Sequence, residues 1–160
     1  LIDYPRVQRV LGHGDTKSSV LLQDGFQADL RLVADDSRGA ALQYFTGSKA
    51  HNILLRDRAL GRGLKLNEYG LFAVADDRRI AGATEEGVYE ALGLAWIPPE
   101  LREGRGEIEA AETASLPALI TDRDLRGGVH MHTTETDGRG TLEAMVAPAA
   151  DPGRAYIALA

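Results

Sequence analysis

Hydrophobic and polar residues alternate over residues 26–33, which predicts a β-strand with one apolar and one polar face. The apolar face carries Phe26, Ala28, Leu30 and Leu32, and the polar face carries Gln27, Asp29 and Arg31. The dipeptide Asp24-Gly25 is a strong hairpin signal, so we expect a partner strand over residues 18–22. Before this hairpin, apolar residues at helical spacing predict a short helix that starts at Pro5 and that Gly12 and Gly14 end.

The middle of the chain combines helices with short strands. The pattern predicts helices over 40–45, 49–60 and 85–92 and strands over 64–67, 70–74 and 79–80. Ser48 and Thr84 precede two of these helices, and both are residue types that accept hydrogen bonds from a first helical turn. Gly61 and Gly63 follow the second helix and stop it.

The last third of the chain begins where Pro98-Pro99 interrupts the pattern. Residues 98–126 include a stretch rich in Gly, Glu and Ala, which indicates a linker with some helical tendency. A strand over 128–132, a helix over 141–147 and a strand over 155–159 then predict the opening of a βα-repeat domain. We therefore expect an α+β fold whose structured parts are residues 1–34, 35–97 and 127–160.

Composition and charge narrow the choice of function. No apolar run approaches the roughly 18 residues of a transmembrane helix, and the first residues do not resemble a signal peptide. The absence of cysteine excludes disulfides and thiolate metal sites and fits a cytoplasmic protein. Residue 1 is not Met, so we do not expect it to be the true N-terminus.

The distribution of charge matters more than its sum. The net charge of −6 by itself argues against a nucleic-acid-binding protein. However, residues 48–67 carry five basic side chains and one acid, followed by a glutamate-rich stretch over 84–112. Such a basic segment can present a local phosphate-binding face.

Two groups of residues in the first half could carry chemistry. Asp29 and Arg31 share a strand face, where a carboxylate could bind a divalent cation, but transfer by two metals needs several carboxylates. Lys49, Asn52 and Arg56 line one helix face and could contact bases or phosphates. From the pattern alone, a salt-bridged strand face and a solvated helix face remain open alternatives.

A third group lies near the end of the chain. His130 and His132 stand two residues apart on a predicted strand, and Asp137 follows in a loop bounded by glycine. Imidazole and carboxylate groups are common zinc ligands, but a catalytic zinc site usually has three protein ligands and water. A pair of histidines on a surface strand is the alternative.

The first 102 residues resemble family X DNA polymerases in the order and spacing of several motifs. These motifs are Gly14-Asp15-Thr16-Lys17-Ser18-Ser19-Val20, Gln27-Ala28-Asp29-Leu30-Arg31, Tyr44-Phe45-Thr46-Gly47-Ser48, His51-Asn52 and Leu64-Lys65-Leu66-Asn67-Glu68-Tyr69. The resemblance implies that residues 1–34 are the end of a nucleotidyltransferase palm sheet and that residues 35–97 are a small α/β thumb.

The resemblance also implies roles for individual residues. Asp29 would bind the catalytic metal, Mg²⁺ or Mn²⁺, and receive the proton of the primer 3′-hydroxyl. Arg31 would gate Asp29 and pair with Glu68. The nucleotide-binding residues would be Tyr44, Phe45, Gly47 and Asn52, with the aromatic pair beside the sugar and Asn52 facing the base. The DNA-binding residues would be Lys17, Lys49 and Arg56.

The chain departs from the family pattern in two ways. Lys49 stands where the best-known member of the family has an acidic residue beside the nucleotide base. The first two metal-binding aspartates and the triphosphate-binding glycine motif, which the family carries upstream, are absent from this sequence. We therefore expect that these 160 residues by themselves do not polymerise DNA.

The end of the chain resembles the first motif of PHP phosphoesterase domains, which follow the thumb in bacterial family X polymerases. The motif runs from Leu125 to Thr134 and continues as Thr136-Asp137-Gly138. The resemblance implies that His130, His132 and Asp137 belong to a multinuclear Zn²⁺ or Mn²⁺ centre with 3′–5′ exonuclease activity. Later motifs of that domain are missing, so the centre would be incomplete here.

The sequence thus predicts part of a cytoplasmic, monomeric DNA polymerase of family X that fills repair gaps. Its partners would be gapped or primer–template DNA and dNTP, with no membrane. Two alternatives stay open: a non-catalytic DNA-binding thumb module and a stand-alone PHP metal phosphatase. An Asp-X-Asp motif upstream would favour the polymerase, and further histidine motifs downstream would favour the hydrolase.

Overall fold

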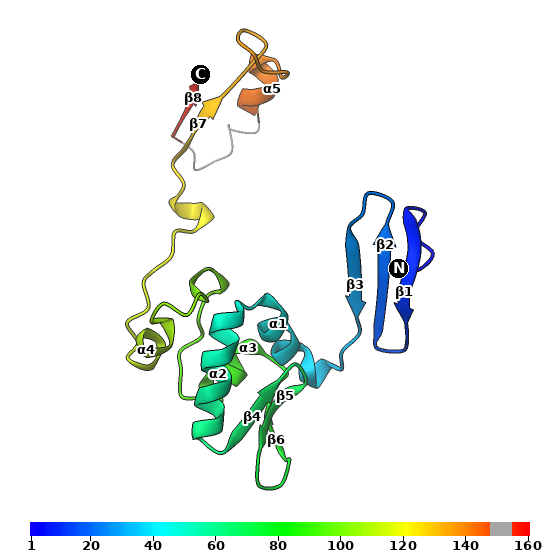
Figure 1. Cartoon of the computed structure of the whole chain (residues 1–160). Coiled ribbons are helices and arrows are strands. Elements are labelled where there is room, and N and C mark those ends of the chain that lie inside the picture. The colour runs from blue at the N-terminus through cyan, green and yellow to red at the C-terminus, as the bar shows by residue number, and fades with distance from the viewer. Residues whose placement is uncertain (148–154) are drawn as a thin grey trace. The chain divides into compact units, whose positions relative to one another are not determined.

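A computed structural model of the chain describes residues 1–147 and 155–160. The backbone forms two compact units, residues Leu1–Leu116 and Pro117–Ala160. Unit 1 contains two antiparallel sheets and most of the helices, and unit 2 contains a small parallel sheet (Figure 1). Within the described residues, no helix is both long and apolar enough to cross a membrane.

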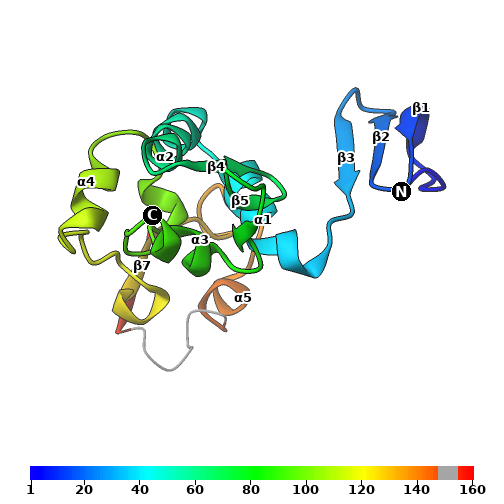
Figure 2. The same cartoon turned by 90° about the horizontal axis from the view of Figure 1, so that it is seen from below.

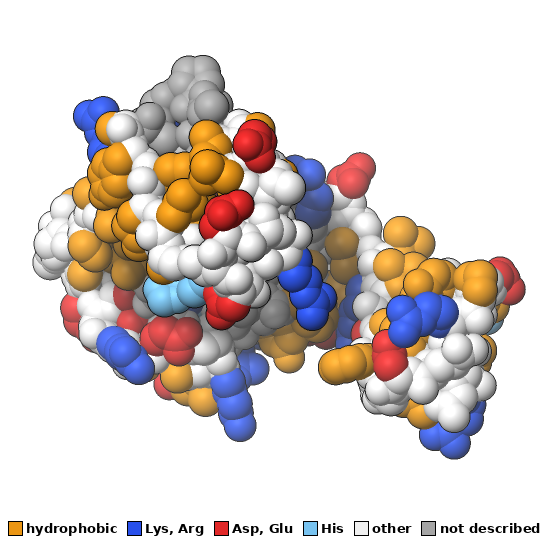
Figure 3. All heavy atoms as spheres, turned by 90° about the horizontal axis from the view of Figure 1, so that it is seen from above, with side chains coloured by type: hydrophobic (Ala, Val, Ile, Leu, Met, Phe, Trp, Pro, Cys, Tyr) orange, Lys and Arg blue, Asp and Glu red, His pale blue; other side chains and the backbone are white. Residues whose placement is uncertain are grey.

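The first sheet of unit 1 has three antiparallel strands in the order β1-β2-β3. They are β1 (Val7–His13), β2 (Lys17–Leu22) and β3 (Gln27–Arg31). The predicted hairpin between β2 and β3 is confirmed, and Gly25 adopts the left-handed backbone, φ 85°, that its turn needs. The apolar face predicted for β3 is largely exposed, and hydrophobic side chains gather on the surface of this sheet (Figure 3).

The helix predicted at the start of the chain is wrong, because this segment is strand β1. Its pairing with β2 shifts register between Val7 and Arg9 and again between Val10 and Gly12. Each irregularity adds a residue and breaks the strict alternation of a strand. The apolar residues are therefore spaced as they would be on a helix, although the backbone pairs with β2.

The rest of unit 1 packs helices against the second sheet. The helices are α1 (Arg38–Thr46), α2 (Lys49–Gly61), α3 (Glu85–Ala91) and α4 (Glu107–Glu112), with short 3₁₀ turns at Asp35–Ser37 and Pro99–Leu101. The strands are β4 (Leu64–Asn67), β5 (Gly70–Ala73) and β6 (Arg79–Ala81), paired in the order β4-β5-β6. These elements confirm the helices and strands predicted over residues 40–92.

Hydrophobic burial holds these elements together. Side chains from α2, β5 and α3 meet in one core whose fully buried members include Leu55, Ala59, Leu71, Val88 and Leu92. Burying a side chain of this size is worth about 1.5–3 kcal/mol, so this core is the main support of the helices. It also fixes α2 beside β4, as Figure 1 shows.

A close approach at Gly39 sets the position of α1. A Cβ atom at this residue would lie 2.1 Å from the carbonyl carbon of Thr84, so any other side chain would push α1 away from α3. The first N–H groups of α1 donate to the loop before α3, from Gly39 to Ala83 at 3.1 Å and from Ala40 to Gly82 at 2.8 Å. These bonds satisfy donors that a helix N-terminus leaves free.

Part of the predicted linker belongs to unit 1. Residues 98–126 were expected to connect two domains, but Arg102, Glu107, Ile108 and Ala111 are buried against the core. Helix α4 lies beside α2 in two views of the structure, and Arg58 of α2 donates to Glu112 of α4 at 2.8 Å (Figures 1 and 2). The Gly- and Glu-rich composition suggested a solvated segment, whereas buried partners order it.

Unit 2 contains a strand, a helix and a second strand. They are β7 (Gly127–Met131), α5 (Leu142–Val146) and β8 (Tyr156–Leu159), preceded by a 3₁₀ turn at Asp122–Asp124. β7 and β8 are parallel, so the predicted strand–helix–strand order is confirmed. The assignment of this unit to a PHP domain stays a prediction.

Candidate functional site

A pocket of about 470 Å³ opens where α1 ends and α2 begins. Its lining is formed by Tyr44, Phe45, Thr46, Gly47, Ser48, Lys49, Asn52 and Arg56. Gly47 ends α1 with φ 73°, a left-handed value that favours glycine, and the Gly47–Ser48 peptide is cis. The side chain of Ser48 accepts a hydrogen bond from the N–H of His51 at 3.3 Å, which confirms Ser48 as the N-cap of α2.

Asn52 is held in one orientation at the pocket wall. Its Oδ1 accepts a hydrogen bond from Nε2 of Gln43 at 2.7 Å, and its Nδ2 donates to the backbone oxygen of Tyr44 at 2.8 Å. Gln43 is buried, and both bonds are partly shielded from water. An amide group carries two N–H donors, so Asn52 keeps one donor for a bound molecule.

The aromatic pair lies at the pocket and not in the core. The rings of Tyr44 and Phe45 meet edge to face with centroids 5.1 Å apart, and Phe45 is 51% exposed. The guanidinium of Arg31 lies over the Phe45 ring, 5.0 Å from its centroid, which is a cation–π distance. Arg31 and Glu68, which the family resemblance would pair, form no ion pair in the described structure.

The basic residues of this region divide into paired and free groups. Arg58 binds Glu112 and the backbone oxygen of Leu92, and Lys65 binds Asp77 at 2.9 Å. Lys49 and Arg56, by contrast, are exposed at the pocket and form no ion pair with any residue in the described ranges. Their charge is therefore available to a bound anion.

Asp29 lies on the polar face of β3 among hydrogen-bond donors. It accepts from the hydroxyl of Ser19 and from Nε2 of Gln27 at 3.1 Å, and Nζ of Lys17 lies 3.7 Å from Oδ1. The Ser19 bond holds the pKa of Asp29 below its ordinary value, with slight burial opposing and Gln27 and Lys17 helping. Asp29 is therefore ionised at neutral pH, as a ligand of a hard cation must be.

His130, His132 and Asp137 come close together in unit 2. The two imidazole centroids are 4.9 Å apart, and Nδ1 of His132 lies 2.6 Å from Oδ1 of Asp137. This nitrogen lacks a partner with hydrogen-bond geometry, and His130 has a left-handed backbone with φ 64°. The donor set suits zinc or manganese, yet no three such side chains in the described ranges are arranged to hold an ion.

The sequence did not predict the buried residues that hold the pocket-lining residues in position. Gln43 orients Asn52, and His51 is completely buried between Glu107 and Tyr89. A glutamine on the buried side of a predicted helix was the one available signal for Gln43. No local signal connects His51 to Glu107, because the two are 56 residues apart.

The chain is similar to known DNA polymerases. Residues 41–103 match the family model of the DNA polymerase beta thumb. The chain is 35% identical over 161 residues to the DNA polymerase/3′-5′ exonuclease PolX of Bacillus subtilis, an alignment that covers 99% of this chain. These matches show that the chain is similar to part of a family X DNA polymerase. It spans 28% of the length of the Bacillus subtilis protein.

Two crystal structures of Leishmania infantum polymerase beta are also similar to this chain. A ternary P/T complex has a TM-score of 0.53 and 25% identity, and covers 61% of this chain and 48% of its own. A ternary gap complex has a TM-score of 0.53 and 23% identity, covering 61% and 45%. All the residues that line the pocket lie within the matched thumb, 41–103, while Asp29 and the histidine pair lie outside it.

Proposed function

We propose that this chain provides the nucleotide pocket and part of the DNA-binding surface of a polymerase that fills gaps by two-metal nucleotidyl transfer. One observation supports this most: an oriented amide, an aromatic pair and two exposed cations converge on the pocket between α1 and α2. A base, a sugar and phosphates need these three kinds of group.

Each group has a role in holding the incoming dNTP. Asn52 directs its remaining N–H at the edge of the base, because Gln43 and Tyr44 fix the rest of its amide. Tyr44 and Phe45 pack beside the sugar and exclude a ribose 2′-hydroxyl. Lys49 and Arg56 attract phosphates of the nucleotide and DNA, so binding weakens as salt rises.

Asp29 takes the role of a catalytic carboxylate. Its ionised oxygens would ligate Mg²⁺ or Mn²⁺, which supplies charge stabilisation for phosphoryl transfer when it is bound. The carboxylate then receives the proton of the primer 3′-hydroxyl. Ser19 and Gln27 hold Asp29 in place, Lys17 contacts the DNA backbone, and Arg31 gates the carboxylate from its position over Phe45.

Unit 2 suggests a second, hydrolytic activity. We propose that His130, His132 and Asp137 provide part of a Zn²⁺ or Mn²⁺ centre of the PHP type that removes nucleotides from 3′ ends. The short distance between His132 and Asp137 and the neighbouring His130 ring support this assignment. The rest of the ligands would come from outside these residues. We place the whole protein in the cytoplasm, as a monomer.

Primer extension on a one-nucleotide gap tests the polymerase proposal. The full-length gene product is compared with its Asp29→Ala variant, and Asp24→Ala, which removes a carboxylate from the turn of the same sheet, is the control. We expect Asp29→Ala to retain DNA binding and lose extension with Mg²⁺ and Mn²⁺, while Asp24→Ala extends normally. Equal extension by all three proteins would show that Asp29 is not a catalytic carboxylate, and DNA binding without extension by the wild type would favour a non-catalytic binding module.

A further inference from the structure

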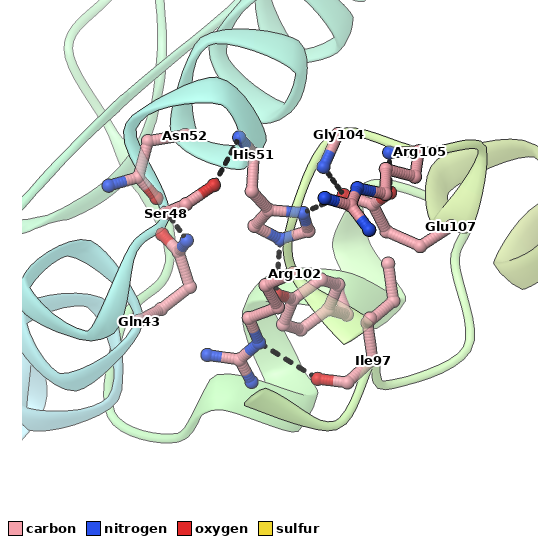
Figure 4. Close-up of polar contacts among 10 residues, drawn as sticks. Gln43, Ser48, His51, Asn52, Ile97, Arg102, Gly104, Arg105 and Glu107 are labelled. Atoms are coloured by element: carbon pink, nitrogen blue, oxygen red, sulfur yellow. Dashed lines mark hydrogen bonds and ion pairs between the residues drawn. The ribbon is translucent and has the colours of Figure 1, made fainter. Parts of the chain in front are cut away.

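A buried polar network lies directly beneath the pocket. His51 is completely buried, and its Nδ1 lies 2.7 Å from Oε1 of Glu107 (Figure 4). Its Nε2 lies 2.8 Å from the hydroxyl of Tyr89. His51 stands next to Asn52 in the first turn of α2, so the position of its ring determines where that turn lies. The three partners come from α2, α3 and α4.

The protonation of this network is set by its surroundings. Burial lowers the pKa of His51 and raises that of Tyr89, so both are neutral at pH 7. Burial acts against ionisation of Glu107, but bonds from His51 and from backbone N–H groups outweigh it and lower its pKa. His51 therefore donates from Nδ1 to the Glu107 carboxylate and accepts at Nε2 from the Tyr89 hydroxyl.

Glu107 also orders the loop that precedes it. Its Oε1 accepts from the N–H of Gly104 at 2.8 Å and its Oε2 from the N–H of Arg105 at 2.6 Å. One carboxylate therefore joins the loop to His51, as Figure 4 shows. Removing it would leave the buried Nδ1–H of His51 without a partner, which is costly in a protein interior, and would release the N–H groups of Gly104 and Arg105.

A second contact ties the same loop to the pocket. The N–H of Ser48 donates to the backbone oxygen of Arg102 at 3.0 Å. Arg102 is itself immobilised, since its buried guanidinium binds both oxygens of Glu85 at 2.7 and 3.1 Å and its Nε donates to Ile97. The segment from Arg102 to Glu107 thus forms hydrogen bonds with the start of α2 at two residues, the N-cap Ser48 and His51 in the first turn.

We propose that Glu107 is a positioning residue for nucleotide binding, acting through His51 to hold the first turn of α2 against the pocket. The proposal rests on the proposed role of that pocket. Glu107 lies beyond the matched thumb, which ends at residue 103, so on this proposal α4 supports the nucleotide site from outside the matched region. Loss of Glu107 lets the first turn of α2 shift. Asn52 and Lys49 then lie farther from their positions for nucleotide binding, and the affinity for dNTP falls.

Steady-state kinetics of the full-length gene product test this role. Glu107→Ala is compared with Glu112→Ala, which removes an exposed carboxylate from the same helix. We expect Glu107→Ala to raise the KM for dNTP about tenfold, with a change in kcat of less than about threefold. The Glu112→Ala variant retains the wild-type KM. Affinity for primer–template DNA, measured without dNTP, stays unchanged in both variants.

A double-mutant cycle shows whether Glu107 acts through His51. If it does, Glu107→Gln raises KM in the wild type but adds little once His51→Phe is present, because the two residues work as one unit. Glu107→Gln keeps the shape of the side chain, so it also replaces Glu107→Ala in the KM measurement if the alanine variant does not fold. Equal KM values for Glu107→Gln and wild type, or additive effects with His51→Phe, would overturn the proposal. A wild type that does not extend primers would instead refute the proposed function.

Discussion

The orientation of one amide illustrates how much depends on single residues. Asn52 faces the pocket from α2, but Gln43 of α1 decides which way its amide group points. The bond between them joins the end of one helix to the start of the next, where the pocket opens. Buried polar pairs of this kind are costly when broken, which makes Gln43 part of the site although it does not line it.

Replacing Gln43 by Leu tests this dependence. The change keeps the side-chain volume and removes the donor, so Asn52 can turn its amide in either direction. We expect the KM for dNTP to rise about three- to tenfold while kcat changes less, since the lost bond is worth about 1 kcal/mol. Primer-extension kinetics measure both constants, with Gln23→Leu at an exposed position as the control. An unchanged KM would show that Asn52 does not need Gln43.

At the scale of secondary-structure elements, buried hydrogen bonds between side chains join helices to one another. α2, α3 and α4 each contribute one member of the Glu107–His51–Tyr89 network, so its bonds connect three helices that the hydrophobic core also holds. A neutral histidine is essential to this arrangement. Acid protonates His51 at the nitrogen that accepts the Tyr89 hydroxyl and places a positive charge at a buried site, which destabilises the contact between α2, α3 and α4.

This network predicts that the chain loses stability in mild acid. The folded-state pKa of His51 is below its ordinary value of 6.5, so the unfolded chain binds the proton first and stability falls as pH drops below 6.5. Glu107 has a lowered pKa as well, and its contribution is lost at more acidic pH, below its ordinary value of 4.5.

Thermal melting between pH 7 and 4 follows both steps. We expect the Tm to fall already between pH 7 and pH 5, and the His51→Phe variant to show a much smaller decrease in that interval. A Tm that stays constant down to pH 5 in the wild type would contradict the buried neutral state of His51.

On the scale of the whole molecule, the boundary between the units lies at Leu116 and Pro117. The predicted linker began near Pro98, yet the residues up to Ala111 bury side chains in unit 1. Beyond the boundary, residues 120–126 are exposed and contain little regular structure apart from a short 3₁₀ turn. Exposed segments of this kind are preferred sites of proteolysis.

Limited proteolysis with trypsin locates the true linker. We expect cleavage after the exposed Arg123 well before cleavage after Arg102, whose side chain is completely buried and bound to Glu85. Mass spectrometry of the first fragments identifies the cut. Early cleavage after Arg102 would mean that α4 is not held against the core, and would weaken the role proposed for Glu107 too.

Local signals in the sequence determined most of the secondary structure. The caps Ser48 and Thr84, the turn at Asp24-Gly25 and the glycines after α2 act on residues within one turn, so the sequence predicts them without knowledge of the fold. The helix predicted for the first segment was wrong because the structure there depends on distant residues. Strand β1 forms by pairing with β2, and the local sequence pattern does not show the two register shifts in that pairing.

In the candidate site too, some features follow from the sequence and others from the tertiary structure. The sequence by itself, through its family resemblance, predicted six of the eight residues that line the pocket, which lie within a short stretch on two successive helices. Only the tertiary structure decided which of their groups are free, because ion pairs and buried bonds join residues far apart in the chain. Folding brings Glu107 to His51 across 56 residues, and that burial makes an ordinary glutamate part of the support of the pocket.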